Sequence, residues 1–277
     1  MHEENFTDAI APEYSYIFNF EKSYSYVDTQ KWLSNNLVYC YWCCIIYCIL
    51  IVGGIYCMLN RPKYNLKRPF ALWCGLMALF SIIGLSRTAP ELFFALGNRS
   101  LYHSVCIPSN YFQNSVSGFW TLALVLSKIV QLCETIFVVL QKERVNFVHI
   151  YGHLSVIIYF CFTYLETTAA MRWFSVMEYF INSCMYSYKT LKAMKFKLPK
   201  CFVILFDAMQ IVQMIISYII TYMAYNQRDT YKLDCYMTYQ NSVFGLTYYI
   251  TSCYFYVRFS CLTYTSKKQK NKGTKNN

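Results

Sequence analysis

Two histidines at the start of an apolar segment are the residues best suited to chemistry in this chain. His149 and His153 are four residues apart, so a helix places both imidazoles on one face. An imidazole, with a pKa of about 6.5, is largely neutral in the cytosol and can act as a nucleophile, a base or a metal ligand. Glu134, in the preceding apolar segment, adds a carboxylate. The alternative is that both histidines lie at a membrane interface without a chemical role.

Other charged side chains, such as Lys128 and Glu178, also interrupt the apolar sequence. A charge at the centre of a membrane helix costs about 2.5 to 3.5 kcal/mol on insertion scales, so these residues indicate a functional interior. A metal site is disfavoured, because the other two histidines, His2 and His103, fall on the opposite side of the membrane. A zinc site completed by Glu134 is a minor alternative. We therefore expect no metal ion and no bound cofactor.

The composition indicates a polytopic membrane protein. The chain has 277 residues, of which 56% are apolar and only 14% charged, which is too apolar for an ordinary soluble domain. The net charge of +11 comes from short loops between apolar runs, a pattern that reflects membrane topology and argues against nucleic-acid binding.

Seven apolar runs are long enough to cross about 30 Å of hydrocarbon at about 1.5 Å per residue. They span roughly residues 37–59, 70–96, 118–140, 145–165, 169–188, 201–225 and 242–262. The second run carries Arg87 and Pro90, so its end is expected to kink or to lie in the interface. The sequence thus predicts an all-α, seven-transmembrane-helix bundle over residues 37–263, preceded by an N-terminal segment (1–36) and followed by a basic tail (264–277).

The distribution of Lys and Arg predicts the orientation. Basic residues concentrate in alternate loops and in the tail, which the positive-inside rule assigns to the cytosol, so the N-terminus is expected in the lumen. The glycosylation sequons at Asn5 and Asn98 both fall on the lumenal side, where such modification occurs. Cys106 and Cys235 fall in lumenal loops as well, and we predict a disulfide between them, with two free thiols as the alternative.

This topology brings polar residues of four helices into the cytosolic half of the bundle. They are Glu134 and Thr135, His149 and His153, Asn182, Tyr186 and Tyr188, and Asp207, Gln210 and Gln213. Such a convergence predicts a pocket that opens to the cytosol and extends into the apolar interior. For the two glutamines, hydrogen bonds between helices are the alternative role.

At these residues the sequence resembles the fatty acid elongase family, membrane enzymes that condense malonyl-CoA with a long-chain acyl-CoA. The resemblance covers most of the chain and is carried by FWTLALVLSKIVQLCETIFVVLQK, FVHIYGHLSVIIY, WFSVMEYFINSCMYSYKTLKA and QIVQM. It is strongest to the subgroup that acts on saturated and monounsaturated chains of palmitate length. The family implies residence in the endoplasmic reticulum membrane, acyl-CoA and malonyl-CoA as substrates, and other elongases, elongation-cycle enzymes or a second copy of the chain as partners.

The sequence departs from the family motifs at positions that carry the chemistry. In the first motif Gln131 replaces Glu and Glu134 replaces Asp, while Lys128 and Thr135 are kept. In the histidine box, which reads His-x-x-His-His in the family, the middle histidine is Gly152.

The third motif differs at three positions. Glu178 replaces Asn, Asn182 replaces His and Lys189 replaces the last Tyr, while Met185, Tyr186 and Tyr188 are kept. The family mechanism, as the resemblance implies it, passes the acyl group to an imidazole at the positions of Gly152 and Asn182, and neither residue can replace that nucleophile. A lost nucleophile costs on the order of 10⁴- to 10⁶-fold in kcat.

Three interpretations compete. The chain is an elongase that uses His149 or His153 with Glu134; or it is a catalytically impaired family member that keeps the acyl-CoA pocket and partners active elongases; or it is a receptor or transporter with a similar topology. Motif order disfavours the third. We expect elongation as the function of the fold. The substrate-binding residues that the resemblance implies are Lys128, Thr135, Asn182, Tyr186, Tyr188, Gln210 and Gln213.

Overall fold

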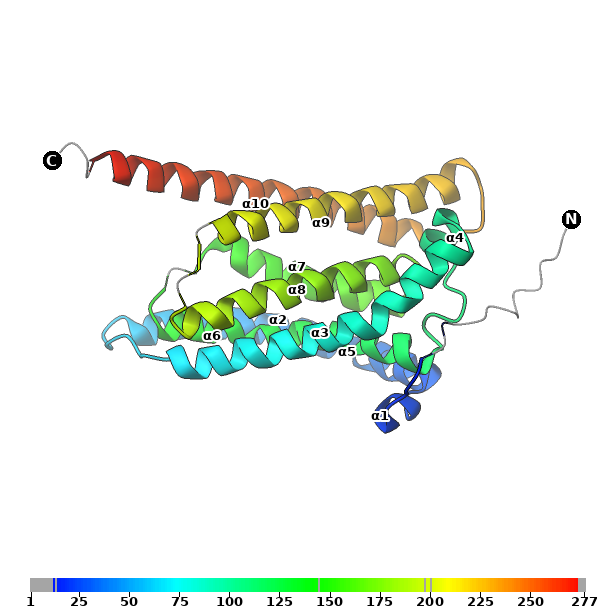
Figure 1. The fold of residues 1–277 in the computed structure, drawn as a ribbon, viewed down its shortest axis with the longest axis horizontal. Helices are drawn as coiled ribbons and strands as arrows, with labels where there is room; N and C mark the ends of the chain where they lie inside the picture. Colours follow the sequence, from blue (N-terminus) through cyan, green and yellow to red (C-terminus); the bar gives the residue numbers. More distant parts are fainter. Residues whose placement is uncertain (1–11, 13, 144, 197, 200, 274–277) are drawn as a thin grey trace, which may run out of the picture.

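The computed structural model describes residues 12, 14–143, 145–196, 198–199 and 201–273, and the regular elements in these ranges are all helices (Figure 1). In chain order they are α1 (Asn19–Lys22), α2 (Tyr26–Met58), α3 (Lys67–Asn98), α4 (Leu101–Cys106), α5 (Ser115–Gln131), α6 (Cys133–Leu140), α7 (Phe147–Leu165), α8 (Met171–Ala193), α9 (Cys201–Tyr225), the π-helical turn η1 (Asn226–Thr230) and α10 (Tyr239–Gly273). The all-α prediction is confirmed for the described part of the chain.

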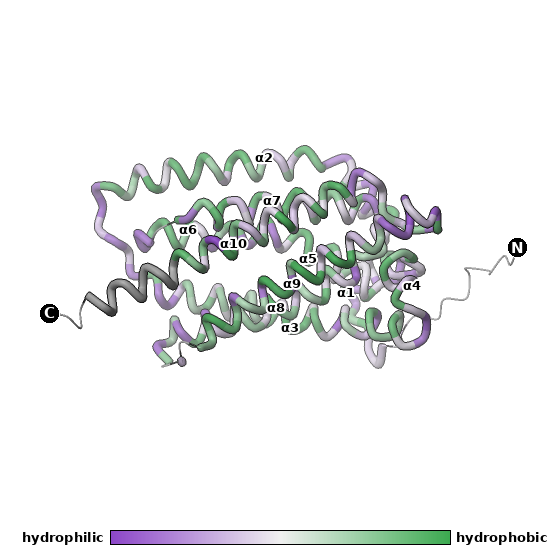
Figure 2. The backbone as a smooth tube through the Cα atoms, turned by 90° about the horizontal axis from the view of Figure 1, so that it is seen from above, coloured by the Kyte–Doolittle hydropathy of each residue, from purple (hydrophilic) through white to green (hydrophobic). Residues whose placement is uncertain are grey.

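The long helices lie roughly along one axis and form an elongated bundle (Figure 1). The loops after α2, α6 and α8 lie together at one end, which we call the basic end because Lys67, Lys142 and Lys195 lie there. Helix α4 and the segment around Cys235 lie at the other end, which we call the disulfide end. Apolar sequence runs along the helices and polar sequence gathers at the turns between them (Figure 2).

In the part of the chain that the structure describes, five helical stretches are long and apolar enough to cross a membrane: Tyr26–Met58, Lys67–Asn98, Ser115–Leu140 (α5 with α6), Phe147–Leu165 and Cys201–Thr230 (α9 with η1). Large apolar side chains such as Val52 and Leu72 are exposed on their outer faces, as lipid contact requires. The protein is therefore a multi-pass membrane protein. Helices α8 and α10 are also long enough to cross a membrane, but charges such as Glu178 and Lys189 lower the hydropathy of α8.

The predicted spans agree with the helices to different degrees. The sixth span, residues 201–225, coincides with α9, whereas the third span, 118–140, is interrupted at Leu132 between α5 and α6. Helix α2 begins at Tyr26, well before the first predicted span, and α3 continues through Pro90.

The closest helix packing in the core joins α3 to α8. A Cβ atom on Gly84 would lie 2.3 Å from the ring of Tyr179, so only glycine lets the ring approach the backbone of α3. The Tyr179 hydroxyl donates a hydrogen bond to the Trp120 carbonyl oxygen of α5, at 2.7 Å. This contact fixes α8 against both neighbours and thereby sets which of its residues face the interior.

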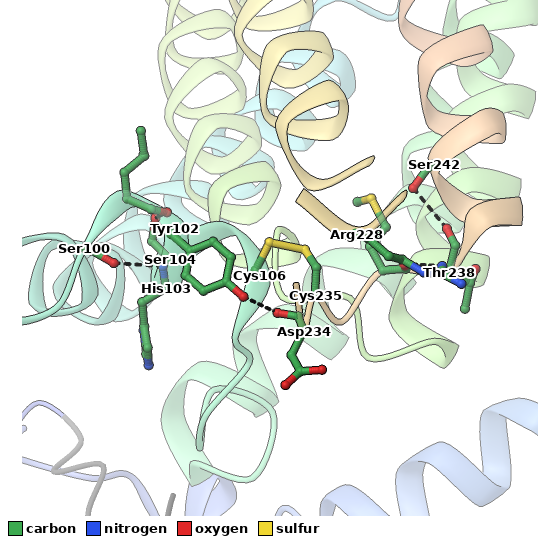
Figure 3. The surroundings of a disulfide bond; sticks show 12 residues. Ser100, Tyr102, His103, Ser104, Cys106, Arg228, Asp234, Cys235, Thr238 and Ser242 are labelled. Atoms are coloured by element: carbon green, nitrogen blue, oxygen red, sulfur yellow. Dashed lines mark hydrogen bonds between the residues drawn. A yellow bond between two sulfur atoms is a disulfide. The ribbon is translucent and has the colours of Figure 1, made fainter. Parts of the chain in front are cut away.

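At the disulfide end the structure joins Cys106 to Cys235, the pair that the sequence predicts (Figure 3). The bond ties α4 to the segment between η1 and α10, and the Tyr102 hydroxyl also donates to the Asp234 carbonyl oxygen there. Asn98 is exposed at the last residue of α3, an accessible place for a glycan. Asn5 lies outside the described residues.

Candidate functional site

A cavity of about 320 Å³ lies between five long helices near the basic end. Helix α7 supplies the two histidines, and α5, α8, α9 and α10, together with the short α6, supply the rest of the wall. The polar residues that line it are Lys128, Gln131, Glu134, Asn146, His149, Tyr151, His153, Glu178, Asn182, Tyr186, Lys189, Gln210, Tyr248, Ser252 and Tyr256. The structure thus brings together residues from all four segments that the sequence predicts to converge.

The imidazoles of His149 and His153 are adjacent, with ring centroids 4.5 Å apart in an edge-on arrangement. Nε2 of His149 lies 2.9 Å from the Thr135 hydroxyl, which in turn lies 2.8 Å from the Tyr47 hydroxyl. Thr135 is wholly buried and does not line the cavity, so its role here is to hold His149. The ring nitrogens of His153 have no hydrogen-bond partner among the described residues, which leaves this imidazole available to a ligand.

Two ion pairs cross the cavity between α8 and its neighbours. Lys128 of α5 pairs with Glu178 of α8, whose carboxylate also accepts a hydrogen bond from Gln213 Nε2 at 2.8 Å. Asn182 Nδ2 lies 3.4 Å from the same carboxylate. A buried ammonium in an apolar bundle requires such an anion, because removal of one partner leaves an uncompensated charge.

The second pair joins Glu134 of α6 to Lys189 of α8, and the Tyr186 hydroxyl donates to Glu134 at 3.0 Å. Glu134 therefore acts in the structure as the anchor of Lys189 and Tyr186, and its second role, as an acid or base beside the histidines, stays a prediction. In each ion pair both the lysine and the carboxylate belong to this chain. These four residues therefore give the cavity wall two positive and two negative charges.

The two positions at which the motifs lack a histidine both border this cavity. Asn182 lines it from α8, and a Cβ atom on Gly152 of α7 would meet no atom within 4 Å. The space next to Gly152 is therefore open, and a side chain placed there would extend the wall toward the interior.

A second cavity, of about 490 Å³, lies further toward the basic end. Both cavities are lined by Glu134, Met185, Lys189, Gln210 and Tyr256, so the Glu134–Lys189 pair lies at the boundary between them. Three further lysines, Lys67, Lys192 and Lys195, line this outer cavity but not the inner one. Tyr188 lies here too, with its ring centroid 5.1 Å from that of Phe206.

The site contains residues that the sequence did not single out. Tyr248, Ser252 and Tyr256 come from α10, and their types are common in membrane helices, so no local signal marks them. Glu178 was singled out as a charge within an apolar segment and Lys189 only as a departure from a motif, and their pairing with Lys128 and Glu134 depends on how α8 faces α5 and α6. Within the described residues no group of three or more His, Cys, Asp or Glu side chains is arranged to hold a metal ion.

Comparisons with known proteins agree with this architecture. Residues 32–272 match the model of a protein family described as ELO: GNS1/SUR4 family. A very long chain fatty acid elongase 6 from Drosophila melanogaster is 40% identical over 256 residues, covering 92% of this chain and 81% of the relative.

Two human proteins are similar over comparable lengths. Very long chain fatty acid elongase 6 is 32% identical over 245 residues, covering 86% of this chain and 91% of the relative. Very long chain fatty acid elongase 3 is 33% identical over 228 residues, covering 82% of this chain and 83% of the relative.

Proposed function

The chain belongs to the ELO (GNS1/SUR4) family, and from this premise we propose that it elongates fatty acids by condensing a long-chain acyl-CoA with malonyl-CoA to a 3-oxoacyl-CoA. The observation that carries the proposal is the pair of adjoining cavities near the basic end, which we call the paired cavity. Its inner part holds adjacent imidazoles. Its outer part is lined by four lysines and three carboxylates, a small positive excess that suits an anionic CoA moiety. The relatives are named as very long chain fatty acid elongases, which supports the same activity.

His153 is the imidazole best placed to accept the acyl group. His149 is held by Thr135, whereas His153 lines the inner cavity with both ring nitrogens unengaged among the described residues. In the first step a ring nitrogen of His153 would attack the thioester carbonyl carbon, the C–S bond would break, and the CoA thiolate would leave. His149, adjacent to it, would take up the ring proton.

In the second step malonyl-CoA would lose CO₂, and its α-carbon would attack the acyl carbonyl. The C–C bond would then form as the bond to the imidazole breaks. Lys128 and Lys189 border this space, and their ammonium groups would donate hydrogen bonds to the oxyanions formed on the way, while the paired carboxylates keep these four residues neutral in sum. Each is already paired with a carboxylate, so neither requires a bound ligand to be tolerated in the apolar interior.

We also propose that α8 and α10 cross the membrane, which gives seven crossings. Their lengths of 23 and 35 residues exceed the roughly 20 that a crossing needs. The lysines at the basic end then face the cytosol, the paired cavity opens to the cytosol, and the disulfide end faces an oxidising lumen, as expected in the endoplasmic reticulum.

The alternative function is a family member that binds acyl-CoA or partners active elongases without condensing. One specific observation favours it, namely that Gly152 and Asn182 stand at the inner cavity where the motifs place histidines. Either function uses the same cavities, so a direct measurement must separate them.

That measurement is condensation in microsomes that lack other elongases. The chain is expressed there and supplied with palmitoyl-CoA and labelled malonyl-CoA, and labelled 3-oxoacyl product is expected above the level of empty microsomes. The control is His153→Gln, which keeps the side-chain length and removes the nucleophile. If the parent chain forms no product while it still binds palmitoyl-CoA, the binding function replaces the proposed one.

A further inference from the structure

Lys128 is the most completely buried amine in the cavity wall, with a side-chain exposure of 1%. Its ammonium lies 5.3 Å from the Phe160 ring centroid, and a ring alone does not neutralise a charge in an apolar bundle. An anion must therefore come from a neighbouring helix or from Lys128's own helix. Two positions border the same cavity near it, Gln131 on α5 and Glu178 on α8.

Position 131 is three residues after Lys128, so both side chains lie on one face of α5. Gln131 is buried and lines the cavity, yet its Nε2 has no hydrogen-bond partner in the described part of the chain. A buried amide whose N–H group has no acceptor is unfavourable there, whereas a carboxylate at that position would have Lys128 within reach. The geometry of position 131 thus suits an acid that this chain does not have.

Glu178 supplies the missing charge from across the cavity. It pairs with Lys128, accepts a hydrogen bond from Gln213 of α9, and lies against Asn182 one turn further along α8. One carboxylate thus connects α5, α8 and α9.

The second ion pair repeats this pattern independently. Lys189 follows Glu178 by eleven residues, about three helical turns, so both lie on the face of α8 that borders the cavity. Lys189 also pairs with an opposite charge, Glu134, on a neighbouring segment. Both of these charges on α8 are therefore balanced within the chain.

We infer that Glu178 is the acid that neutralises Lys128 and thereby the positioning residue of the site. Through it Lys128, Asn182 and Gln213 are held in one arrangement around the inner cavity. The inference deepens the proposed function by naming how the polar wall is kept in place.

The test exchanges the carboxylate and the amide between positions 131 and 178 in the full chain. Three variants are purified in detergent: Glu178→Gln, Gln131→Glu, and the double exchange, which keeps composition and volume unchanged. The control is Asp28→Asn, which removes an exposed carboxylate from α2. The thermal midpoint is measured for each, and the dissociation constant for palmitoyl-CoA is measured well below the lowest midpoint, where every variant is folded.

Glu178→Gln leaves Lys128 unpaired and should lower the midpoint by about 10 °C and weaken palmitoyl-CoA binding roughly 10-fold. Gln131→Glu adds an acid without a second cation and should also lower the midpoint. The double exchange should return both quantities to within about 3 °C and 2-fold of the parent, a strongly non-additive result. Asp28→Asn should change neither.

Additive midpoints would show that a carboxylate at position 131 cannot replace Glu178 beside Lys128, and would overturn the neutralising role of Glu178. Non-additive midpoints with unchanged palmitoyl-CoA affinity in every variant would show that Glu178 only stabilises the fold, and would overturn its positioning role. A chain that forms no condensation product but shows the coupled response in both readouts would disprove the proposed enzyme activity and leave this inference standing.

Discussion

Buried charges occur at both ends of the bundle, but they are used differently. At the disulfide end Arg172 is wholly buried, lies 3.5 Å from Glu91, and donates to the carbonyl oxygens of Ile107 and Pro108 at 3.0 and 2.8 Å. The cavity beside these charges has a volume of only about 30 Å³, enough for very few water molecules.

At the basic end the Lys128–Glu178 and Glu134–Lys189 pairs border cavities of about 320 and 490 Å³. The same kind of interaction therefore borders almost no space around Arg172, which we call the closed end, and large cavities at the basic end, which we call the open end. A further cavity of about 360 Å³ at the disulfide end is lined by Ile107 and Pro108 but by none of these buried charges. Where charges bond to backbone carbonyls and to each other at close quarters, they join elements together. Where they face space that is large enough for a substrate, they form a binding wall.

The largest expected effect concerns the open end. The variant Gly152→His with Asn182→His places imidazoles at both motif positions, and a Cβ on Gly152 meets no atom within 4 Å, so the space exists. Because a lost nucleophile costs on the order of 10⁴- to 10⁶-fold, we expect condensation to rise by roughly 10²-fold or more. Labelled 3-oxoacyl product in microsomes measures it.

The matched control is Gly152→Gln with Asn182→Gln, which fills the same space without an imidazole. Equal rates in the two variants would mean that the added bulk, and not the histidines, changes the activity. A folded histidine variant with no gain would show that the open end no longer positions the substrates for this reaction.

The next effect concerns the closed end. Glu21 of α1 is wholly buried and bonds to Arg87 of α3, at 2.6 and 2.9 Å, and to Trp120 Nε1 of α5, at 2.7 Å. Glu21→Gln leaves the Arg87 guanidinium without its anion, and the free energy of unfolding should fall by about 3 kcal/mol. A lower thermal midpoint with unchanged palmitoyl-CoA affinity would separate the two ends, and the exposed Asp28→Asn serves again as control. Loss of affinity in the folded Glu21→Gln protein would show that the ends are coupled.

The sequence predicted the helices better than the side-chain pairs between them. The apolar pattern and its length predicted both ends of α9. The Lys and Arg pattern placed polar residues of four segments at one depth in the bundle, and the inner cavity is lined by residues from all four. The interruption at Leu132 was not predicted, because the run from Gly118 to Leu140 contains no proline and no internal glycine. Likewise, no local pattern states that Glu178 faces Lys128, because that depends on the rotation of α8 about its axis.

That rotation is itself fixed by long-range packing. The ring of Tyr179 fits over Gly84 of α3 and its hydroxyl bonds to the Trp120 carbonyl of α5, and Tyr179 is the neighbour of Glu178. A glycine and a tyrosine separated by almost a hundred residues thus determine which side of α8 borders the cavity. Sequence patterns within one helix cannot contain this information.

A smaller effect is expected from the disulfide. Cys106→Ser with Cys235→Ser removes a link across 129 residues, which in a soluble chain would cost about 2 to 5 kcal/mol. Here the helices of the membrane bundle already limit the unfolded chain, so we expect about 2 kcal/mol or less, with condensation and acyl-CoA affinity unchanged. Mass mapping of the parent without reduction should recover the linked peptides. Two free thiols in the folded parent would contradict the disulfide at this end.

The smallest effect is on pH dependence. Burial alone would raise the pKa of Glu21, but hydrogen bonds from Arg87, Trp120 and the Phe18 amide hold it below its usual value of about 4.5. Because the unfolded chain then binds the proton more tightly than the folded chain, the stabilisation by Glu21 is fully present above about pH 4.5 and is lost as the pH falls through the lowered pKa of the folded state. The thermal midpoint of the parent should therefore fall more steeply below about pH 4.5 than that of Glu21→Gln. Parallel curves would mean that Glu21 contributes through packing alone, and that the closed end depends on its charges less than the open end does.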